Sequence, residues 1–184
     1  GMFGTEIVVN GSVSDDAGWI NCGANITVLG DVTNGAHNAA AQGKLYVQGG
    51  GGARCETMTK HNPKFDPPES WYFRDVGDTF AEFKAGGIAV VCGVNPRNPE
   101  NILGYRPCVG MVGGVVYFRG PIHGYSENDV KLEDLTEQDW KWLTTKNNGQ
   151  YFHVVSCRFL FPTTSVILFA DHPRLPGGYG ILGC

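Results

Sequence analysis

The stretch GMVGGVVYFRG, residues 110–120, places a short run of β-branched and aromatic residues between glycines. Glycine inside a strand weakens it, because glycine loses more backbone entropy on folding than other residues and offers no side chain to pack. Its use on both sides of a good strand-forming segment therefore needs a structural reason. A repeating architecture would supply that reason, and the same arrangement of glycines and apolar residues does recur along the chain.

Short apolar segments that end in glycine recur through the first two thirds of the chain. The copies are IVVNG, ITVLG, LYVQG, IAVVCG and VVYFRG, which end at Gly11, Gly30, Gly49, Gly93 and Gly120. The first three of these glycines are spaced 19 residues apart. Most copies also have glycine shortly before the strand, at Gly23, Gly43, Gly86–Gly87 and Gly113–Gly114. Five copies at a period of about 20 residues indicate a repeat architecture.

The repeat predicts an all-β fold in which each copy forms one coil of a single-stranded parallel β-helix. Helices are disfavoured because the copies are rich in glycine and β-branched residues. Glycine suits the corners of such coils, since corners need a positive φ or a very close approach of two backbones. We expect corners at Gly11, Gly30, Gly49, Gly87, Gly93, Gly114 and Gly120. We expect one interior ladder to consist of Ile7, Ile26, Leu45, Ile88 and Val115.

Two intervals exceed the period and contain polar, proline-rich insertions. The interval from Gly49 to Gly93 has room for two coils and an excursion, which we place at Lys60–Ser70. The interval from Gly93 to Gly120 contains NPRNPEN, Asn95–Asn101, as its surplus. Insertions at one point of each coil tend to lie on one face of the molecule, and that face is a favoured place for binding.

The character of the sequence changes near residue 126. We therefore divide the chain into a β-helix of residues 2–125 and an extension of residues 126–184. The extension begins as a charged segment without glycine, in which Thr136-x-x-Asp139 is a capping box. We expect a short helix there that covers the open end of the β-helix.

The rest of the extension is apolar and interrupted by proline. Its two apolar runs, Tyr151–Phe161 and Thr164–Ala170, flank Pro162 and predict a hairpin of two strands. The tail that follows, residues 171–184, is rich in glycine and proline and is expected to be irregular.

The overall composition argues against two classes of partner. The formal net charge is −4 and the Lys and Arg residues do not cluster, which argues against nucleic acid. No apolar run approaches the roughly 18 residues that span a bilayer, and the N-terminus shows no signal-peptide pattern. Gly1 before Met2 is interpreted as a remnant of tag cleavage. We therefore expect a cytoplasmic protein without a membrane partner.

The residue types that most often carry chemistry are scattered. The six cysteines include no C-x-x-C pair, so we expect small buried residues and predict no metal site. Cys108 stands near Arg106, and a cation lowers a thiol pKa, but no base or orienting group is identifiable. The glycines of Gly49–Cys55 lack the ending of a P-loop and are explained as a corner. The five histidines lie in unrelated segments, and no catalytic residue is predicted.

Three arginines leave a second possibility open. Basic side chains beside the insertions could shape a pocket for a small anionic ligand. Arg54, Arg74 and Arg106 are the candidate ligand-binding residues of such a site. Arginines also pair with acidic neighbours for structural reasons, and the sequence does not choose between the two roles.

Two copies of the repeat carry a resemblance to a known family. They are VGDTFAEFKAGGIAVVCG, residues 76–93, and GYRPCVGMVGGVVYFRG, residues 104–120. They resemble the GXGXG domain, the right-handed β-helix at the C-terminus of the glutamate synthase large subunit, which is similar to one of the subunits of formylmethanofuran dehydrogenase. The resemblance covers about residues 5–125 and does not extend to residues 150–184. It implies a right-handed coil.

In that family the domain is a scaffold that supplies no catalytic residue. The resemblance implies a free-standing, non-catalytic subunit that packs between glutaminase and flavin/iron–sulfur synthase components. FMN and iron–sulfur clusters are expected only in those partners, so no cofactor is expected in this chain. Two alternatives remain: a small-anion-binding protein or enzyme that uses the loop face, and a homo-oligomeric structural protein whose interface is Phe152–Ala170.

Overall fold

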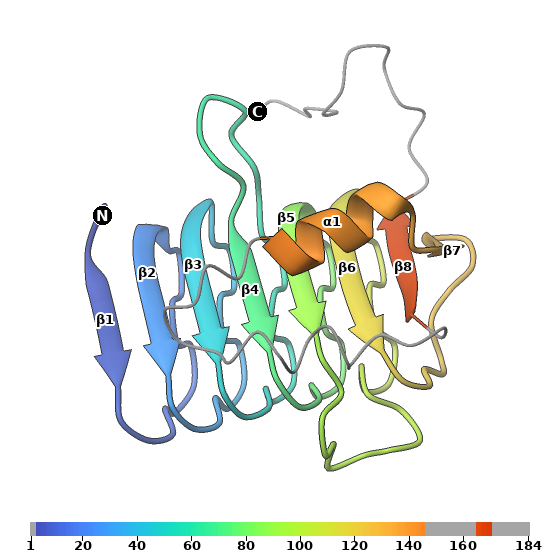
Figure 1. Ribbon diagram of the computed structural model, residues 1–184, viewed down its shortest axis with the longest axis horizontal. Coiled ribbons are helices and arrows are strands. Elements are labelled where there is room, and N and C mark those ends of the chain that lie inside the picture. Colours follow the sequence, from blue (N-terminus) through green and yellow to red (C-terminus); the bar gives the residue numbers. More distant parts are fainter. Residues whose placement is uncertain (1–2, 146–164, 171–184) are drawn as a thin grey trace.

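The computed structural model describes residues 3–145 and 165–170. Its centre is a parallel sheet in which every strand pairs with the next strand along the chain (Figure 1). The six parallel strands are β1 (Glu6–Val9), β2 (Cys22–Val28), β3 (Gln42–Val47), β4 (Glu69–Tyr72), β5 (Ala85–Val91) and β6 (Gly113–Arg119). The sheet continues with two antiparallel strands, β8 (Ser165–Ala170) beside β6 and β7 (Val130–Asp134) beside β8. A short helix, α1 (Glu137–Thr145), crosses the front of this sheet.

The predicted right-handed parallel β-helix is wrong. The six parallel strands form one sheet that does not close. The five connections between them, residues 10–21, 29–41, 48–68, 73–84 and 92–112, contain turns and bends, apart from one isolated bridge between Val13 and Val32. A β-helix would need further strands in these connections, and none is present in any of the five.

The backbone of the connections explains why they form no strands. In each of them, three alternate residues have a positive φ. These residues are Asp16, Gly18 and Ile20; Gly35, His37 and Ala39; Arg54, Glu56 and Met58; Thr79, Ala81 and Phe83; and Arg106, Cys108 and Gly110. A regular strand has a negative φ along its length, with at most an isolated glycine as an exception, so a backbone in which φ alternates in sign over five residues cannot extend into one.

Backbone hydrogen bonds nevertheless join each connection to the next. The amide of Asp16 donates to the carbonyl oxygen of Asn34 at 2.8 Å, and the amide of Gly35 donates to that of Ala53 at 2.9 Å. Short polar side chains add to this pattern, because Asp15 Oδ1 accepts from the amide of Asn34 at 2.9 Å and Asn34 Oδ1 accepts from that of Ala53 at 2.9 Å. Each connection is therefore hydrogen-bonded to the next, as each strand is.

The register of the strands only partly matches the predicted ladder. Ile7, Ile26 and Leu45 pair in one row, as expected, and this row continues through Ser70, Ala89 and Val116. Ile88 and Val115 pair with each other, but in the row that contains Glu69, which lies on the opposite face. Side chains alternate between the faces of a strand, so a shift of one residue moves a side chain to the other face.

The core lies between the sheet and the connections. It contains side chains from β2 to β6 and from each of the five connections. Its fully buried members include Val28, Leu45, Tyr72, Phe80 and Leu103, each with less than 2 % of its surface exposed. At the β6 end, Val130 is buried against this core, with Ile122 and Tyr125 packed beside it. Residues 121–130 therefore close that end.

The predicted helix is confirmed at its start. The Thr136 hydroxyl accepts from the amide of Asp139 at 3.2 Å, and Asp139 Oδ2 accepts from the amide of Thr136 at 2.8 Å, which is the predicted capping box. Its predicted position over the end of the repeat is wrong, because it covers the outer face of the sheet. Trp142 stacks on Trp71 and Tyr117, with ring centroids 6.0 and 5.5 Å apart.

The predicted C-terminal hairpin is described only in its second half. Ser165–Ala170 is a strand, β8, but its partners are β6 and β7. The first apolar run, Tyr151–Phe161, and the tail of residues 171–184 lie outside the described residues. The boundary at residue 126 does not divide the sheet, since β6 lies before it and β8 after it.

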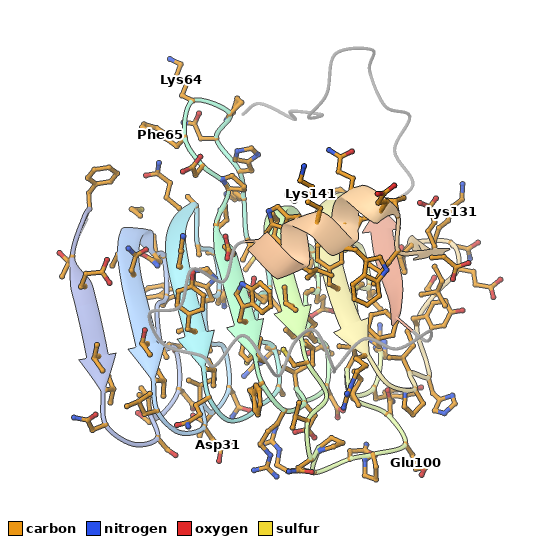
Figure 2. The ribbon with its side chains drawn as sticks, viewed as in Figure 1. Asp31, Lys64, Phe65, Glu100, Lys131 and Lys141 are labelled. Carbon is orange, nitrogen blue, oxygen red and sulfur yellow. The ribbon has the colours of Figure 1, made fainter. Side chains whose placement is uncertain are left out.

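The two proline-rich excursions do not share a face. One projects beyond the starts of the parallel strands and the other beyond their ends. Figure 2 shows Lys64 and Phe65 at the tip of the excursion before β4, and Glu100 on the excursion after β5. The reason is their position in the chain, because one precedes a strand and the other follows one. Arg97 anchors the second excursion: its Nε lies 2.9 Å from Asp75 Oδ1.

The seven predicted corner glycines occupy two kinds of position. Those that follow a strand are Gly11, Gly30, Gly49, Gly93 and Gly120, of which the first and the last two have a positive φ. Gly87 and Gly114 lie inside β5 and β6, where the pairing register shifts. These two glycines therefore bend strands.

Candidate functional site

A group of ionisable side chains lies inside the core, where the second, third and fourth connections meet β4. Glu56 is at its centre, with Oε1 3.0 Å from His37 Nδ1 and Oε2 3.1 Å from Lys84 Nζ. Lys84 also donates to Thr59 Oγ1 at 2.8 Å, and the Tyr72 hydroxyl donates to Glu56 Oε1 at 3.3 Å. We call these five residues the buried charge network. Each is fully or almost fully buried.

Asn21 fixes the orientation of the histidine. Its Oδ1 accepts from the amides of Gly23 and Ala24, so its Nδ2 is turned toward His37 Nε2, 3.5 Å away. Because Nδ2 can only donate, Nε2 is the acceptor of the ring and Nδ1–H is the group that donates to Glu56. In this series of contacts, which runs from Asn21 through His37 and Glu56 to Lys84, each donor thus faces an acceptor.

The network is arranged to hold a charge pair in the core. Burial alone would raise the pKa of Glu56, but the Lys84 ammonium and His37 outweigh burial and lower it to about 2. Burial, with Cys55 and Glu56 beside it, raises the pKa of Tyr72 well above its usual value. Glu56 is therefore a carboxylate and Tyr72 a neutral phenol at neutral pH. No proton needs to move, and no solvent reaches the group.

Sequence reasoning missed this network, although part of its signal was present. It gave His37 no role, yet His37 and Glu56 are 19 residues apart, which is the period of the repeat. Both occupy the middle positive-φ position of their connections. Lys84 lies beyond the excursion that interrupts the period, so a fixed spacing could not have aligned it with Thr59.

The cysteines are mostly core residues, as predicted. Cys55, Cys92 and Cys108 are buried and Cys22 is partly exposed, and none of the four forms a disulfide with another described residue. Burial raises the pKa of Cys55 and of Cys108 to about 12. Cys108 is therefore a neutral thiol inside the core and lacks the properties of a nucleophile. Cys157 and Cys184 lie outside the described residues.

This difference in exposure leads to a labelling prediction. In the native protein at pH 8, iodoacetamide is expected to modify Cys22 while Cys55 and Cys108 remain unmodified, because only a thiolate that reagent can reach reacts. Peptide mapping by mass spectrometry reads each site separately. The unfolded protein in urea is the control, in which all three label. Rapid native labelling of Cys108 would contradict the buried assignment.

The three candidate arginines do not converge. Arg54 and Arg106 occupy equivalent positions on the third and fifth connections, with Thr79 of the fourth connection between them. Arg74 lies at a different corner, directly after β4, where its Nε donates to the carbonyl oxygen of Asn95 at 3.0 Å. Arg54 lines a hollow in the surface whose lining contains neither Arg74 nor Arg106.

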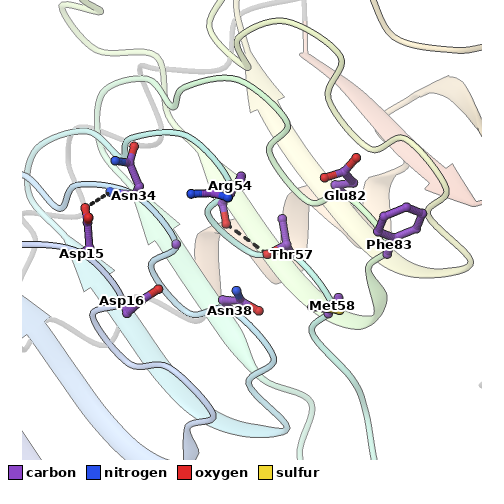
Figure 3. Close-up of a pocket in the computed structure, with 10 residues that line it drawn as sticks. Asp15, Asp16, Asn34, Asn38, Arg54, Thr57, Met58, Glu82 and Phe83 are labelled. Carbon is purple, nitrogen blue, oxygen red and sulfur yellow. Dashed lines mark hydrogen bonds between the residues drawn. The ribbon is translucent and has the colours of Figure 1, made fainter.

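That hollow, of about 460 Å³, lies on the outer side of the first four connections (Figure 3). Gly35 lies between Asp16 and Arg54, which hold the equivalent positions on either side, and places no side chain in the hollow. Its lining consists of Asp15, Asp16, Asn34, Gly35, Asn38, Arg54, Thr57, Met58, Glu82 and Phe83.

The charges of the hollow are mainly negative. Arg54 shares it with the carboxylates of Asp15, Asp16 and Glu82. The pKa of Asp15 is lowered by the Thr33 hydroxyl, which donates at 2.6 Å, and by the amide of Asn34. Three carboxylates and one guanidinium disfavour an anion, so this hollow gives little support to an anion site built on Arg54.

Residues 3–145 and 165–170 contain neither a cluster of metal ligands nor a membrane-spanning helix. No three His, Cys, Asp or Glu side chains gather there as ligands of a metal ion. No helix in those ranges has the length and apolar character needed to cross a membrane.

Comparisons with protein-family models, curated proteins and solved structures find no match to the chain.

Proposed function

We propose that the chain is a non-catalytic scaffold subunit of a glutamate-synthase-like, glutamine-dependent complex, and that it packs between glutaminase and flavin/iron–sulfur synthase components. The observation that carries the proposal is the buried charge network. Its acid, base and ammonium groups are those that an enzyme would expose to a substrate, and here they bind one another inside the core. They tie successive connections together and so support a rigid body.

The arrangement of the body supports the same role. Strands and connections are each hydrogen-bonded to the next, so the surface is held in a fixed shape. The excursions at residues 60–68 and 95–101 project beyond opposite ends of the parallel strands, where they can contact two different proteins. Binding residues often lie on loops that a rigid framework positions.

The identity of the complex rests on the glycine repeat, chiefly on residues 76–93 and 104–120. On this proposal FMN and iron–sulfur clusters belong to the partners, and the complex works in the cytoplasm. The alternative of a stand-alone anion-binding protein or enzyme has less support, because the arginines are dispersed and Arg54 is surrounded by carboxylates.

Affinity purification from the native cells at low salt tests the proposal. The tagged chain is expected to bring down a glutaminase-like polypeptide and a flavin/iron–sulfur polypeptide, identified by mass spectrometry. The eluate should be yellow-brown, with the visible absorbance of flavin and iron–sulfur clusters. An unrelated protein that carries the same tag is the control. A colourless chain that elutes alone would contradict the proposal.

A further inference from the structure

The parallel sheet has a free edge at β1. Among the residues described, β1 pairs only with β2, and no strand lies on its other side. The amides of Asn25 and Leu29 donate to the carbonyl oxygens of Thr5 and Val9, so these alternate residues of β1 face β2. In a parallel ladder the intervening residues, here Glu6 and Val8, direct their backbone groups to the other side. Those groups are available to another strand.

The core is also incompletely covered at this edge. Phe3, Trp19 and Ile20 have 76, 60 and 50 % of their surface exposed, and Val8, on the outer face of β1, has 48 % exposed. Val13 and Ala17, which pack on the core from the first connection, are only half-buried. The opposite end differs, because β8 pairs with β6 and residues 121–130 cover the core there. Within the described part of the chain, the core is thus covered at one end and exposed at the other.

We propose that the β1 edge is an interface between two copies of this chain. The two β1 strands pair antiparallel about a two-fold axis perpendicular to the sheet, so that the two sheets become continuous. With the axis at Ile7, Ile7 of one copy lies opposite Ile7 of the other on the core face. Glu6 then lies opposite Val8 of the second copy, and the two Glu6 carboxylates are not paired with each other.

The charges of the first connection fit the same symmetry. Gly18 lies behind Ile26, because a Cβ at Gly18 would be 3.3 Å from Ile26 Cδ1, and Ile26 pairs with Ile7. Along the strand direction, Gly18, the middle of this connection, therefore lies at the level of Ile7 and of the axis. Asp16, at the start of the connection, then lies at the level of the apolar Ile20 of the second copy, so that the acidic residues of the two copies stay apart.

The chain itself shows that this sheet accepts an antiparallel strand at an edge. At the other end β8 pairs antiparallel with β6 over five residue pairs, from Val115–Phe169 to Arg119–Ser165. A parallel edge is therefore compatible with an antiparallel neighbour in this fold. A pairing of β1 with β1 is isologous, because each copy supplies the same surface, and the assembly closes at two copies.

Light scattering after size exclusion, over a dilution series of the purified chain, tests the interface. The expected mass is twice the 19.9 kDa of one chain at high concentration. Val8→Pro removes an amide that points away from β2, so it is expected to return the mass to that of one chain while circular dichroism stays unchanged. Val8→Thr keeps the amide and is expected to remain dimeric. A wild-type chain that is monomeric throughout, or a dimeric Val8→Pro variant, would overturn the proposal.

Hydrogen exchange on the wild-type chain gives a second test that needs no variant. Peptides that cover residues 3–10 are expected to exchange more slowly at high than at low protein concentration, because pairing protects their amides. Peptides from β4 and β5, whose two neighbours lie within the chain, should exchange equally at both concentrations. Equal exchange of residues 3–10 at both concentrations would also overturn the proposal. A contact elsewhere in the chain would leave these residues unprotected.

Discussion

Lys84→Met is expected to lower the free energy of unfolding by about 3–5 kcal/mol. Lys84 is fully buried and its ammonium lies 3.1 Å from Glu56 Oε2. Methionine fills a similar volume, so the substitution removes the charge and leaves the Glu56 carboxylate in the core without its ammonium partner. Removing one member of a buried ion pair is costly because the remaining charge has lost its solvation by water and is no longer compensated.

Urea unfolding followed by circular dichroism measures this loss, and a double variant separates its cause. Glu56→Gln combined with Lys84→Met removes both charges while an amide oxygen can still accept from His37 and Tyr72. It is expected to recover at least half of the lost stability, because no isolated charge is left. A double variant that is as unstable as Lys84→Met would show that packing, and not charge, dominates at this site.

The Glu56 carboxylate also makes the stability of the fold depend on pH. The pKa of Glu56 is lowered from 4.5 to about 2 in the folded chain. Between these values the unfolded chain binds a proton that the folded chain does not, so the stabilisation by Glu56 is complete above pH 4.5 and is lost as the pH falls toward 2. The advantage of the wild-type chain over the double variant should shrink through that window.

Gly43→Ala is expected to cost about 3 kcal/mol or more, since a left-handed conformation alone costs an alanine about 1–2 kcal/mol. Gly43 has a φ of +80° inside β3. A Cβ there would lie 2.3 Å from the carbonyl oxygen of Ala24 and 2.9 Å from its amide nitrogen. Both atoms belong to the backbone of β2, which cannot move without breaking its pairing with β3.

Gly4→Ala is the matched control for this substitution. Gly4 has a similar φ of +72°, but no atom lies within 4 Å of the position its Cβ would take. Its loss of stability is expected to be about 1–2 kcal/mol, the cost of the backbone conformation alone. Thermal unfolding of both variants gives the comparison. Equal losses would show that the close approach of β2 and β3 contributes nothing.

The positions of most strands follow from the sequence because glycine marks their ends. The error in the ladder came from aligning the copies at their first apolar residue. Counted back from the glycine, the fourth residue is Ile7, Ile26, Leu45, Ala89 or Val116, and these five residues share the inward row of the sheet. The glycine after the strand fixes the register, whereas the start of the strand varies with the bends in β5 and β6.

The connections were harder to predict because their backbone conformation differs from the one that their residue types prefer on their own. Ile20, Thr79 and Phe83 all have a positive φ, which is unfavourable for bulky and β-branched residues. Hydrogen bonds to the neighbouring connections and the packing of the core impose it. A sequence reading that assigns positive φ to glycine alone therefore expects extended segments here, and with them a β-helix.

The candidate site was hidden for a related reason. Its members are brought together by stacking of the connections, which the sequence shows only where the spacing is regular. His37 and Glu56 keep that spacing, whereas Lys84 is displaced by the excursion before β4. The excursion itself was visible from its prolines. Its effect on the alignment of later residues was not.

The order of the six parallel strands in the sheet is the same as their order in the chain. During synthesis each parallel strand after β1 can pair at once, because its partner is the strand that precedes it in the chain. The entropy lost on closing each loop is therefore that of one connection, and it rises only slowly with the extra length of an excursion. Such a chain can begin to fold on the ribosome as soon as two consecutive strands have emerged, and each later strand finds a finished edge to join.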